Sequence, residues 1–265
     1  MSEPIGIIGL GLLGSAVAER LHEAGRSLRG FDPRRPDDLP VELCPDASQV
    51  FVNCSPVIFS LPTSRESTLV IDEVESVLKP GQIVLDTTTG SPEEMSALAE
   101  RLQQLDVHYL EANVAGSSAL LRAGEAGLLI GGDETIAEAL KPLFADLTDA
   151  GAHYLGPVGN ASRFKLVHNL ILGLNRAVIA EALQFAESLG FDSSRAVSVL
   201  RQTAAASVAL TGKGERMAER RYHPPQAPCC PKNSSIIQIS RFERTESGQN
   251  SSSKIMSSPR SSIME

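Results

Sequence analysis

The stretch Ile5-Gly6-Ile7-Ile8-Gly9-Leu10-Gly11-Leu12-Leu13-Gly14 decides the fold of this chain. Its first four residues predict a short buried strand, and the apolar segment 12–24 that follows predicts a helix. The glycines match G-x-G-x-x-G, which permits a tight turn, close approach of the backbone to a pyrophosphate, and an anion site at the helix N-terminus. The alternative is a glycine turn needed only for packing. The predicted cofactor residues of this loop are Gly9, Gly11, Leu12, Leu13 and Gly14.

An acidic residue, Asp32, ends the next predicted strand over 27–31, at the distance of about 20 residues expected for a ribose-binding carboxylate. A carboxylate there repels a 2′-phosphate and favours NAD. Arg34 and Arg35 follow and could instead clamp that phosphate in NADP, or lie in a solvated loop. We therefore expect NAD or NADP as the cofactor, with NAD preferred.

Short apolar runs alternate with amphipathic segments as far as residue 155. Further strands are predicted over 56–61, 82–86, 108–111 and 128–130, and helices over 64–78, 92–104 and 134–147. Continuous apolar strands that alternate with helices indicate a parallel sheet covered on both faces. The sequence predicts an α/β fold, a Rossmann-type doubly wound parallel sheet, for an NAD(P)-binding domain over 1–158.

The pattern changes at Gly156-Pro157-Val158-Gly159, which predicts a domain boundary. One long helix is predicted over 164–189; it is apolar nearly all round, so we expect it to be buried. Charged residues such as Lys165 and Glu181 argue against its crossing a membrane. With a second helix over 194–209, residues 159–223 predict an all-α domain for substrate binding and oligomerisation that looks incomplete.

The tail 224–265 has a different composition, with eleven Ser, five Pro and no Leu, Val or Asp. Such a segment buries too little apolar surface to offset the entropy of ordering, so we expect it to be disordered.

Composition excludes several classes of function. The net charge of −8, the absence of Trp and an aromatic content of 4% argue against a nucleic-acid partner. None of the four Cys has the CxxC spacing of a zinc site, and no metal is predicted. The N-terminus lacks the basic region of a signal peptide, and no apolar run approaches roughly 18 uncharged residues. We expect a cytoplasmic protein with no membrane partner.

Several motifs together resemble the β-hydroxyacid dehydrogenases, the family of 3-hydroxyisobutyrate dehydrogenase, 2-hydroxy-3-oxopropionate reductase and, more distantly, 6-phosphogluconate dehydrogenase. Ser60-Leu61-Pro62 is similar to the family's cofactor-contacting Leu-Pro loop. The segment DTTTGSP over 86–92 is similar to its Asp-x-Ser-Thr segment, with Thr89 near the cofactor. The segment EANVAGS over 111–117 resembles its substrate loop. The ordered set covers about residues 4–222 and is more specific than any one motif.

The resemblance implies hydride transfer between NAD(P) and a short β-hydroxy acid or semialdehyde, with Leu61, Pro62 and Thr89 at the cofactor. It places the substrate carboxylate at Ala115, Gly116 and Ser117. Ala115 stands where the family has a serine, so that hydroxyl is lost. Ser117 or Ser118 could replace it, or backbone N–H groups could bind the carboxylate. Arg122 is a further anion contact or an exposed arginine.

The segment 156–161 followed by Lys165 and Asn169 resembles the family's catalytic motif. The two residues are four apart and share one helix face. A lysine whose pKa is lowered by desolvation can act as general base, and an amide can orient a hydroxyl. The spacing alone favours a surface lysine and a partly exposed asparagine, but together with the full motif set it favours catalysis. His168 is a further candidate proton carrier, but it is interpreted as a hydrogen-bonded structural histidine.

The resemblance stops near Tyr222, whereas family members continue through several more helices that cover the active site and build the dimer. One of those helices carries a Lys-Asp pair, and this chain has no Lys-Asp dipeptide. Such a change is what a shifted reading frame or a truncated gene would produce. A non-catalytic or defective NAD(P)-binding relative and an imine-reducing member of the same fold remain alternatives, and the resemblance allows a homodimer.

Overall fold

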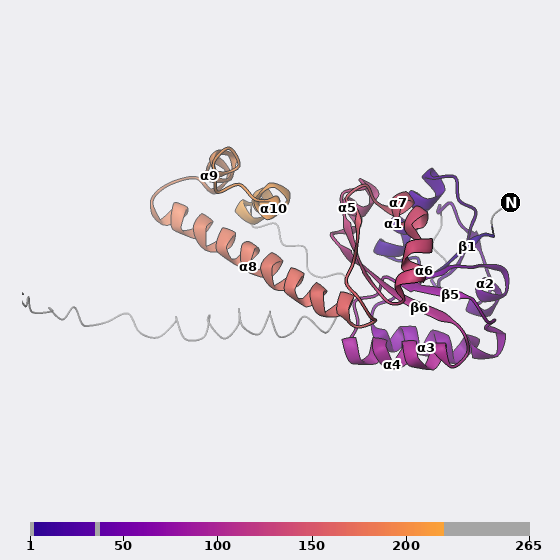
Figure 1. Ribbon diagram of the computed structural model, residues 1–265. Coiled ribbons are helices and arrows are strands. Elements are labelled where there is room, and N and C mark those ends of the chain that lie inside the picture. The colour runs from indigo at the N-terminus through magenta and orange to yellow at the C-terminus, as the bar shows by residue number, and fades with distance from the viewer. Residues whose placement is uncertain (1–2, 35–37, 220–265) are drawn as a thin grey trace, which may run out of the picture. The chain divides into compact units, whose positions relative to one another are not determined.

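The computed structural model describes residues 3–34 and 38–219. The expectations for Arg35 and for the tail 224–265 lie outside these residues. One sheet of eight strands organises the N-terminal region, in the order β3-β2-β1-β4-β5-β6-β7-β8 (Figure 1). The strands are β1 Ile5–Ile8, β2 Leu28–Phe31, β3 Glu42–Leu43, β4 Val57–Phe59, β5 Ile83–Asp86, β6 His108–Ala115, β7 Gly127–Gly131 and β8 Ala152–Tyr154.

The sheet is parallel from β3 to β6, and the strand order reverses beside β1, between β2 and β4. The carboxyl ends of strands at such a reversal form the usual ligand crevice of an open α/β sheet. The predicted doubly wound parallel sheet is confirmed, with one exception that the sequence did not indicate: β7 runs antiparallel to β6. Only the short helix α5, Ser118–Arg122, lies between these two strands, and it does not form a crossover that would return the chain in the parallel direction.

Helices cover both faces of the sheet, as the doubly wound fold requires (Figure 1). One face packs against α1 Leu12–Glu23 and α7 Lys141–Leu147. The other packs against α2 Ala47–Asn53, α3 Ser64–Val74 and α4 Pro92–Gln103. Since both faces are covered, the central strands are buried along their whole length, which explains their continuous apolar sequences.

Several short elements differ from the prediction. The helix expected over 134–147 is two helices, α6 Glu134–Ala139 and α7, and Pro142 lies in the first turn of the second. A proline lacks the N–H that a continuous helix needs at that place. The sequence also gave no prediction for α2, β3 and β8. Helix α3 ends at Val74 and continues as the short 3-10 turn η1, Glu75–Val77.

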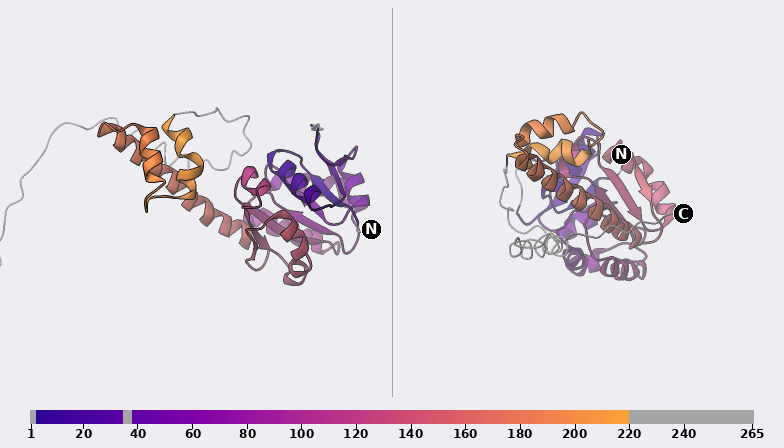
Figure 2. Two further views of the ribbon diagram at one scale, coloured as in Figure 1. Left: turned by 90° about the horizontal axis from the view of Figure 1, so that it is seen from above. Right: turned by 90° about the vertical axis from the view of Figure 1, so that its left-hand side faces the viewer.

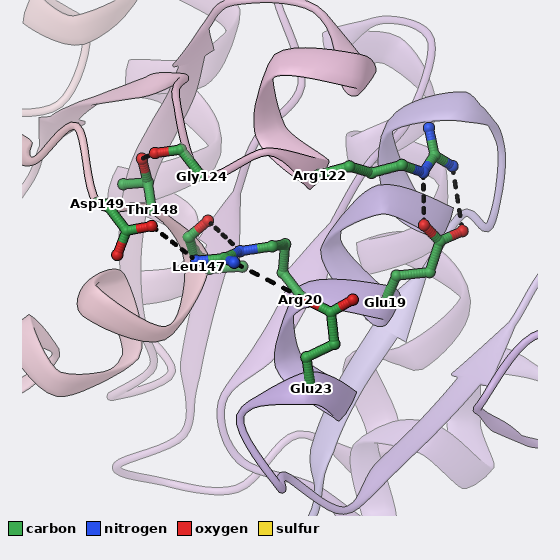
Figure 3. Close-up of polar contacts among 8 residues, drawn as sticks. All are labelled: Glu19, Arg20, Glu23, Arg122, Gly124, Leu147, Thr148 and Asp149. Atoms are coloured by element: carbon green, nitrogen blue, oxygen red, sulfur yellow. Dashed lines mark hydrogen bonds and ion pairs between the residues drawn. The ribbon is translucent and has the colours of Figure 1, made fainter.

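Polar contacts join α1 to α5, to the end of α7 and to the loop that follows α7 (Figure 3). Arg20 donates to the carbonyl oxygen of Leu147 at 3.2 Å, and its guanidinium lies 3.5 Å from the carboxylate of Asp149. Arg122 pairs with Glu19 on the surface. This pairing favours the interpretation of Arg122 as an exposed structural arginine over that of an anion ligand.

The C-terminal part consists of α8 Asn160–Ser188, α9 Ser193–Leu200 and α10 Val208–Ala218. The first turns of α8 contact β6, β7 and α4, and its later turns contact α9 and α10. Figure 2 shows α9 and α10 beside those later turns, where Ile179 and Leu183 of α8 form a small core with them. The second helix predicted over 194–209 is wrong at its end, because α9 stops at Leu200 and a new helix starts at Val208.

The prediction that the long helix is buried is also wrong for the described residues. Large apolar side chains of α8 are exposed, among them Phe164, Val167, Leu170, Ile171, Leu174 and Val178. Only one side of α8 has packing partners within the described part of the chain. By length and composition α8 is apolar enough to cross a membrane, whereas the sequence-based expectation was that its charged residues argue against this. Core helices of soluble proteins meet the same criterion of length and composition.

Candidate active site

The glycine loop lies at the carboxyl end of β1, at the reversal of strand order. Gly9 has a φ of +90°, which L-amino acids with a side chain rarely adopt. A Cβ on Gly14 would lie 1.9 Å from the carbonyl oxygen of Gly9. Helix α1 starts after Gly11 with no capping side chain, so its first N–H groups have no side-chain acceptor there; Leu12 is exposed and Leu13 is partly buried. The loop therefore fits a pyrophosphate by backbone geometry and helix dipole.

Asp32 is buried and connects the end of β2 to this loop. Its carboxylate accepts hydrogen bonds from the N–H of Leu10 at 2.8 Å and from the N–H of Arg34 at 2.9 Å, and the guanidinium of Arg34 pairs with it. Burial acts to raise the pKa of Asp32, but these hydrogen bonds outweigh it and hold the pKa below its ordinary value. The Arg34 guanidinium also lies over Gly11, where an added Cβ would be 3.3 Å from it. An ionised carboxylate and a cation therefore share the ribose end of the site.

The loop after β4 closes the other side of the glycine turn. A Cβ on Gly9 would lie 2.5 Å from the carbonyl oxygen of Ser60 and 3.1 Å from the side chain of Leu61. The N–H of Leu61 donates to Thr88 on the neighbouring strand end. Pro62 and Thr89 are exposed beside these residues. The structure thus gathers the predicted cofactor residues along the carboxyl ends of β1, β4 and β5.

A buried carboxylate holds the β5 end of this site in place. Asp86 accepts hydrogen bonds from the hydroxyl groups of Ser67 and Tyr109 and from the N–H of Thr88. Burial raises the pKa of Asp86, and the donated hydrogen bonds partly oppose this effect. The network fixes the segment that leads to Thr89.

The predicted substrate loop follows β6. Ala115 is the last residue of the strand, and Gly116 and Ser117 are exposed. The hydroxyl of Ser117 accepts the N–H of Leu120 and so caps α5. The oxygen of this hydroxyl accepts while its O–H can still donate, so both the hydroxyl and the backbone N–H groups of the loop are candidates for binding a carboxylate.

Lys165 meets this loop from α8. It is 7% exposed, and its Nζ donates to the carbonyl oxygen of Val114, next to Ala115. Burial lowers the pKa of Lys165 to about 8. A lysine that ionises this close to neutrality can both accept and donate a proton. The structure therefore brings the predicted general base to the predicted substrate loop.

Asn169 lies one helical turn beyond Lys165 and is half-buried. Its Oδ1 is 3.2 Å from Nδ1 of His168, so the two side chains are hydrogen-bonded to each other. This contact agrees with the interpretation of His168 as a structural histidine, and it orients the amide of Asn169.

Sequence reasoning missed three buried polar residues beside Lys165. Glu111 accepts hydrogen bonds from the N–H of Gly159, at 2.7 Å, and from the hydroxyl of Ser162. Asn113 donates to the same hydroxyl at 3.4 Å, and its Oδ1 has no partner among the described residues. Polar residues at positions 111 and 113, on one face of an otherwise apolar strand, were the pattern that could have identified Glu111 and Asn113; Ser162 lies on α8 and gave no such signal.

Comparisons with known proteins agree with this geometry. Residues 4–156 match the family model of the NAD-binding domain of 6-phosphogluconate dehydrogenase. Residues 159–227 match a second family model, which is described as NAD-binding of NADP-dependent 3-hydroxyisobutyrate dehydrogenase. In sequence, 2-hydroxy-3-oxopropionate reductase of Escherichia coli K12 is 30% identical over 228 residues, which is 83% of this chain and 77% of that protein.

Solved structures share the fold. The crystal structure of 3-hydroxyisobutyrate dehydrogenase from Salmonella typhimurium superposes with a TM-score of 0.77 at 22% identity, over 92% of this chain and 88% of the other. An imine reductase variant from Myxococcus stipitatus, in complex with NAD+, superposes with a TM-score of 0.67 at 18% identity. The match covers 93% of this chain and 88% of the other.

Proposed function

The chain belongs to the β-hydroxyacid dehydrogenase family of NAD(P)-dependent oxidoreductases, and from this premise we propose that it transfers a hydride between a nicotinamide cofactor and a short β-hydroxy acid or the matching semialdehyde. One observation carries the proposal. Lys165 is buried against the substrate loop, and its pKa is lowered to about 8. Such a group is suited to take the proton from a hydroxyl while hydride leaves the same carbon.

The cofactor, when bound, accepts or supplies the hydride. In the oxidative direction, neutral Lys165 takes the hydroxyl proton at Nζ, and the carbonyl oxygen of Val114 then holds the ammonium group. The C–H bond breaks as hydride leaves, and a C=O bond forms. In the reductive direction the ammonium returns the proton to the oxygen. Asn169 orients the substrate hydroxyl without adding charge, and its bond to His168 limits its rotation.

The substrate class follows from the loop after β6. We propose that the N–H groups of Gly116 and Ser117 bind the carboxylate of the substrate beside Ala115, at the exposed turn between β6 and α5. Ala115 has a methyl group where the usual family loop has a serine hydroxyl. This loop therefore has more space beside the substrate and one hydrogen-bond donor fewer. The substrate is therefore a small carboxylate held by backbone donors.

The cofactor is proposed to be NAD. The lowered pKa of Asp32 keeps its carboxylate charged, and its position at the end of β2 supports the proposal that it accepts the ribose hydroxyl groups, since the same charge disfavours a 2′-phosphate. Arg34 supports NADP as the alternative, because its guanidinium is exposed and lies over Gly11. Titration with NADH and NADPH distinguishes the two: we expect Asp32→Ser to weaken NADH binding and leave NADPH binding unchanged or stronger. Tighter binding of NADPH by the unaltered chain would contradict the NAD assignment.

We also propose a cytoplasmic protein whose exposed apolar α8 surface packs on a second copy of the chain. Arg176 and Glu181 interrupt that surface, which favours a protein partner over lipid. Apolar patches of this kind are unusual on free monomers. Sedimentation over a range of concentrations tests it, and a monomer at all concentrations would contradict it.

The central experiment mixes the full chain with NAD+ or NADP+ and a panel of short β-hydroxy acids, and follows the nicotinamide absorbance. We expect reduction of the cofactor, and a loss of about 10²–10⁴-fold in turnover for Lys165→Met with an unchanged cofactor Kd. Exposed Lys213 provides a matched control, since Lys213→Met should keep full turnover. Equal turnover of Lys165→Met and the unaltered chain would refute the assignment.

Two alternatives give other results in the same assay. A non-catalytic relative binds the cofactor, seen as nicotinamide fluorescence, and turns over no hydroxy acid. An imine reductase oxidises NADPH or NADH with a cyclic imine; its fold is shared, but the buried Lys165 favours the hydroxy acid.

A further inference from the structure

Helix α8 begins without a capping side chain of its own. Its N-cap residue, Gly159, has a φ of +92° and offers no side-chain acceptor. The first N–H groups of any helix lack partners within the helix, so α8 needs acceptors from elsewhere.

A strand of the sheet supplies these acceptors. The carboxylate of Glu111 on β6 accepts the N–H of Gly159 at 2.7 Å and the hydroxyl of Ser162. Glu111 is fully buried and has no ion-pair partner among the described residues. Burial raises its pKa, while the donated hydrogen bonds and the helix dipole stabilise the carboxylate.

The neighbouring strand leaves space for this contact. Gly131 on β7 lies opposite Glu111 in the antiparallel register. A Cβ on Gly131 would lie 2.6 Å from Oε2 of Glu111 and 3.3 Å from the side chain of Ala161. A larger residue would push the carboxylate away from the helix, so Gly131 and Glu111 act together.

A second contact joins the same strand and helix. Val114 follows Glu111 by three residues, and Lys165 follows Ser162 by three residues. Glu111 bonds to Ser162, and Val114 bonds to Lys165. We propose that Glu111 is a positioning residue, which anchors the start of α8 to β6 and thereby holds Lys165 against the substrate loop. The inference rests on the proposed role of Lys165 in catalysis.

Other ionisable groups near Glu111 do not reach the helix. Asp86 lies beside Glu111 in register on β5, and Tyr109 precedes it on β6. These two bond to each other, and Asp86 also bonds to Ser67. Asp86 is therefore a matched control: a buried carboxylate on the next strand whose hydrogen bonds go elsewhere.

The experiment measures the titration of Lys165 directly. The full chain is labelled with acetic anhydride from pH 6 to pH 11, and the modified peptide is quantified by mass spectrometry. In the unaltered chain Lys165 should titrate at about 8. Glu111→Asp keeps the charge but shortens the side chain, so the start of α8 moves away, water reaches Lys165, and its pKa rises by about one unit or more. Turnover should fall by about 10²-fold with an unchanged cofactor Kd.

Comparison among variants separates position from charge. Glu111→Gln should also raise the pKa of Lys165, because one donor loses its acceptor. Asp86→Asn should lower Tm and leave the Lys165 titration unchanged. A Lys165 titration that stays near its original value in both Glu111 variants would overturn the inference. A lower pKa of Lys165 in Glu111→Gln, with no change in Glu111→Asp, would also overturn the inference, because the charge of Glu111 alone would then account for the effect.

Two further provisions keep the result decisive. If Glu111→Asp does not fold, Ser162→Ala removes one donor from the helix side and should give a smaller rise of the same sign; no rise would overturn the inference. Labelling needs no substrate. If the Glu111 variants show the expected rise in the pKa of Lys165 but the unaltered chain shows no turnover, the proposed function is contradicted and the anchoring role stands.

Discussion

The sheet and the long helix α8 are both apolar, yet only the sheet is buried. Phe59 on β4 is 0% exposed, whereas Phe164 on α8 is 47% exposed and Val178 is 67% exposed. Strand β4 lies in the middle of the sheet, where helices cover both faces and bury its side chains. A helix satisfies its own backbone and can form with few neighbours. Apolar sequence therefore shows which side chains can be buried, and burial itself depends on a partner.

The proposed chemistry lies where these two regions meet. Glu111 belongs to the sheet and Lys165 to α8, and each is buried by the other region. A buried polar group is costly unless it is hydrogen-bonded, and both residues are.

The largest contrast is expected from removing a phenyl ring in each region. Phe59→Ala should lower the free energy of unfolding by about 3–5 kcal/mol, because it leaves a cavity in the core. Phe164→Ala should cost less than about 1 kcal/mol at concentrations that keep the chain monomeric. Urea denaturation measures both values. Similar losses would show that α8 is as well packed as the sheet.

A smaller effect is expected at the junction. The pKa of Lys165 is about 8 in the folded chain, and its ordinary value is 10.5. Between pH 8 and pH 10.5 the unfolded chain therefore binds more protons than the folded chain. The free energy of unfolding rises with pH over this range. Below pH 8 the folded chain bears the full cost of burying the amine, about 3 kcal/mol. Lys165→Met should therefore be more stable than the unaltered chain at pH 7 by up to that amount, and should lose the rise between pH 8 and 10.5.

Thermal unfolding across this pH range checks the expectation, with Lys213→Met as the control. Exposed Lys213 should show neither the gain at pH 7 nor the altered slope. A less stable Lys165→Met at pH 7 would mean that the amine contributes packing or hydrogen bonding beyond its desolvation cost.

The smallest effect is expected from a helix glycine with open surroundings. Gly212 lies in α10, and no atom lies within 4 Å of a Cβ added there. Gly212→Ala should stabilise the chain by about 0.5–1 kcal/mol, because alanine has the higher helix propensity.

Gly14 on α1 provides the control with the opposite expected sign, since a Cβ added there would collide with Gly9. Gly14→Ala should destabilise the chain and weaken NADH binding. A destabilised Gly212→Ala would reveal a partner on α10.

Local elements were predicted well and junctions were not. The strand, glycine loop and helix over 5–23 follow from spacing along a short segment, and the structure confirms them. The direction of β7, the division of 134–147 into two helices and the exposure of α8 were wrong or missed. Each of these features depends on the length of the segment between two elements or on the presence of a packing partner. The local periodicity of the sequence contains neither.

The sequence by itself determined the α/β fold, the dinucleotide loop and the family, because each depends on residue types at short, regular intervals. It also pointed to Lys165 and Asn169, which share a helix face by spacing alone. Only the tertiary structure decided that Lys165 is buried beside Val114 and that Glu111 caps the start of α8. Those contacts join residues 48 and 51 positions apart, and their energies arise from burial and hydrogen bonds that exist only after the helix packs on the sheet.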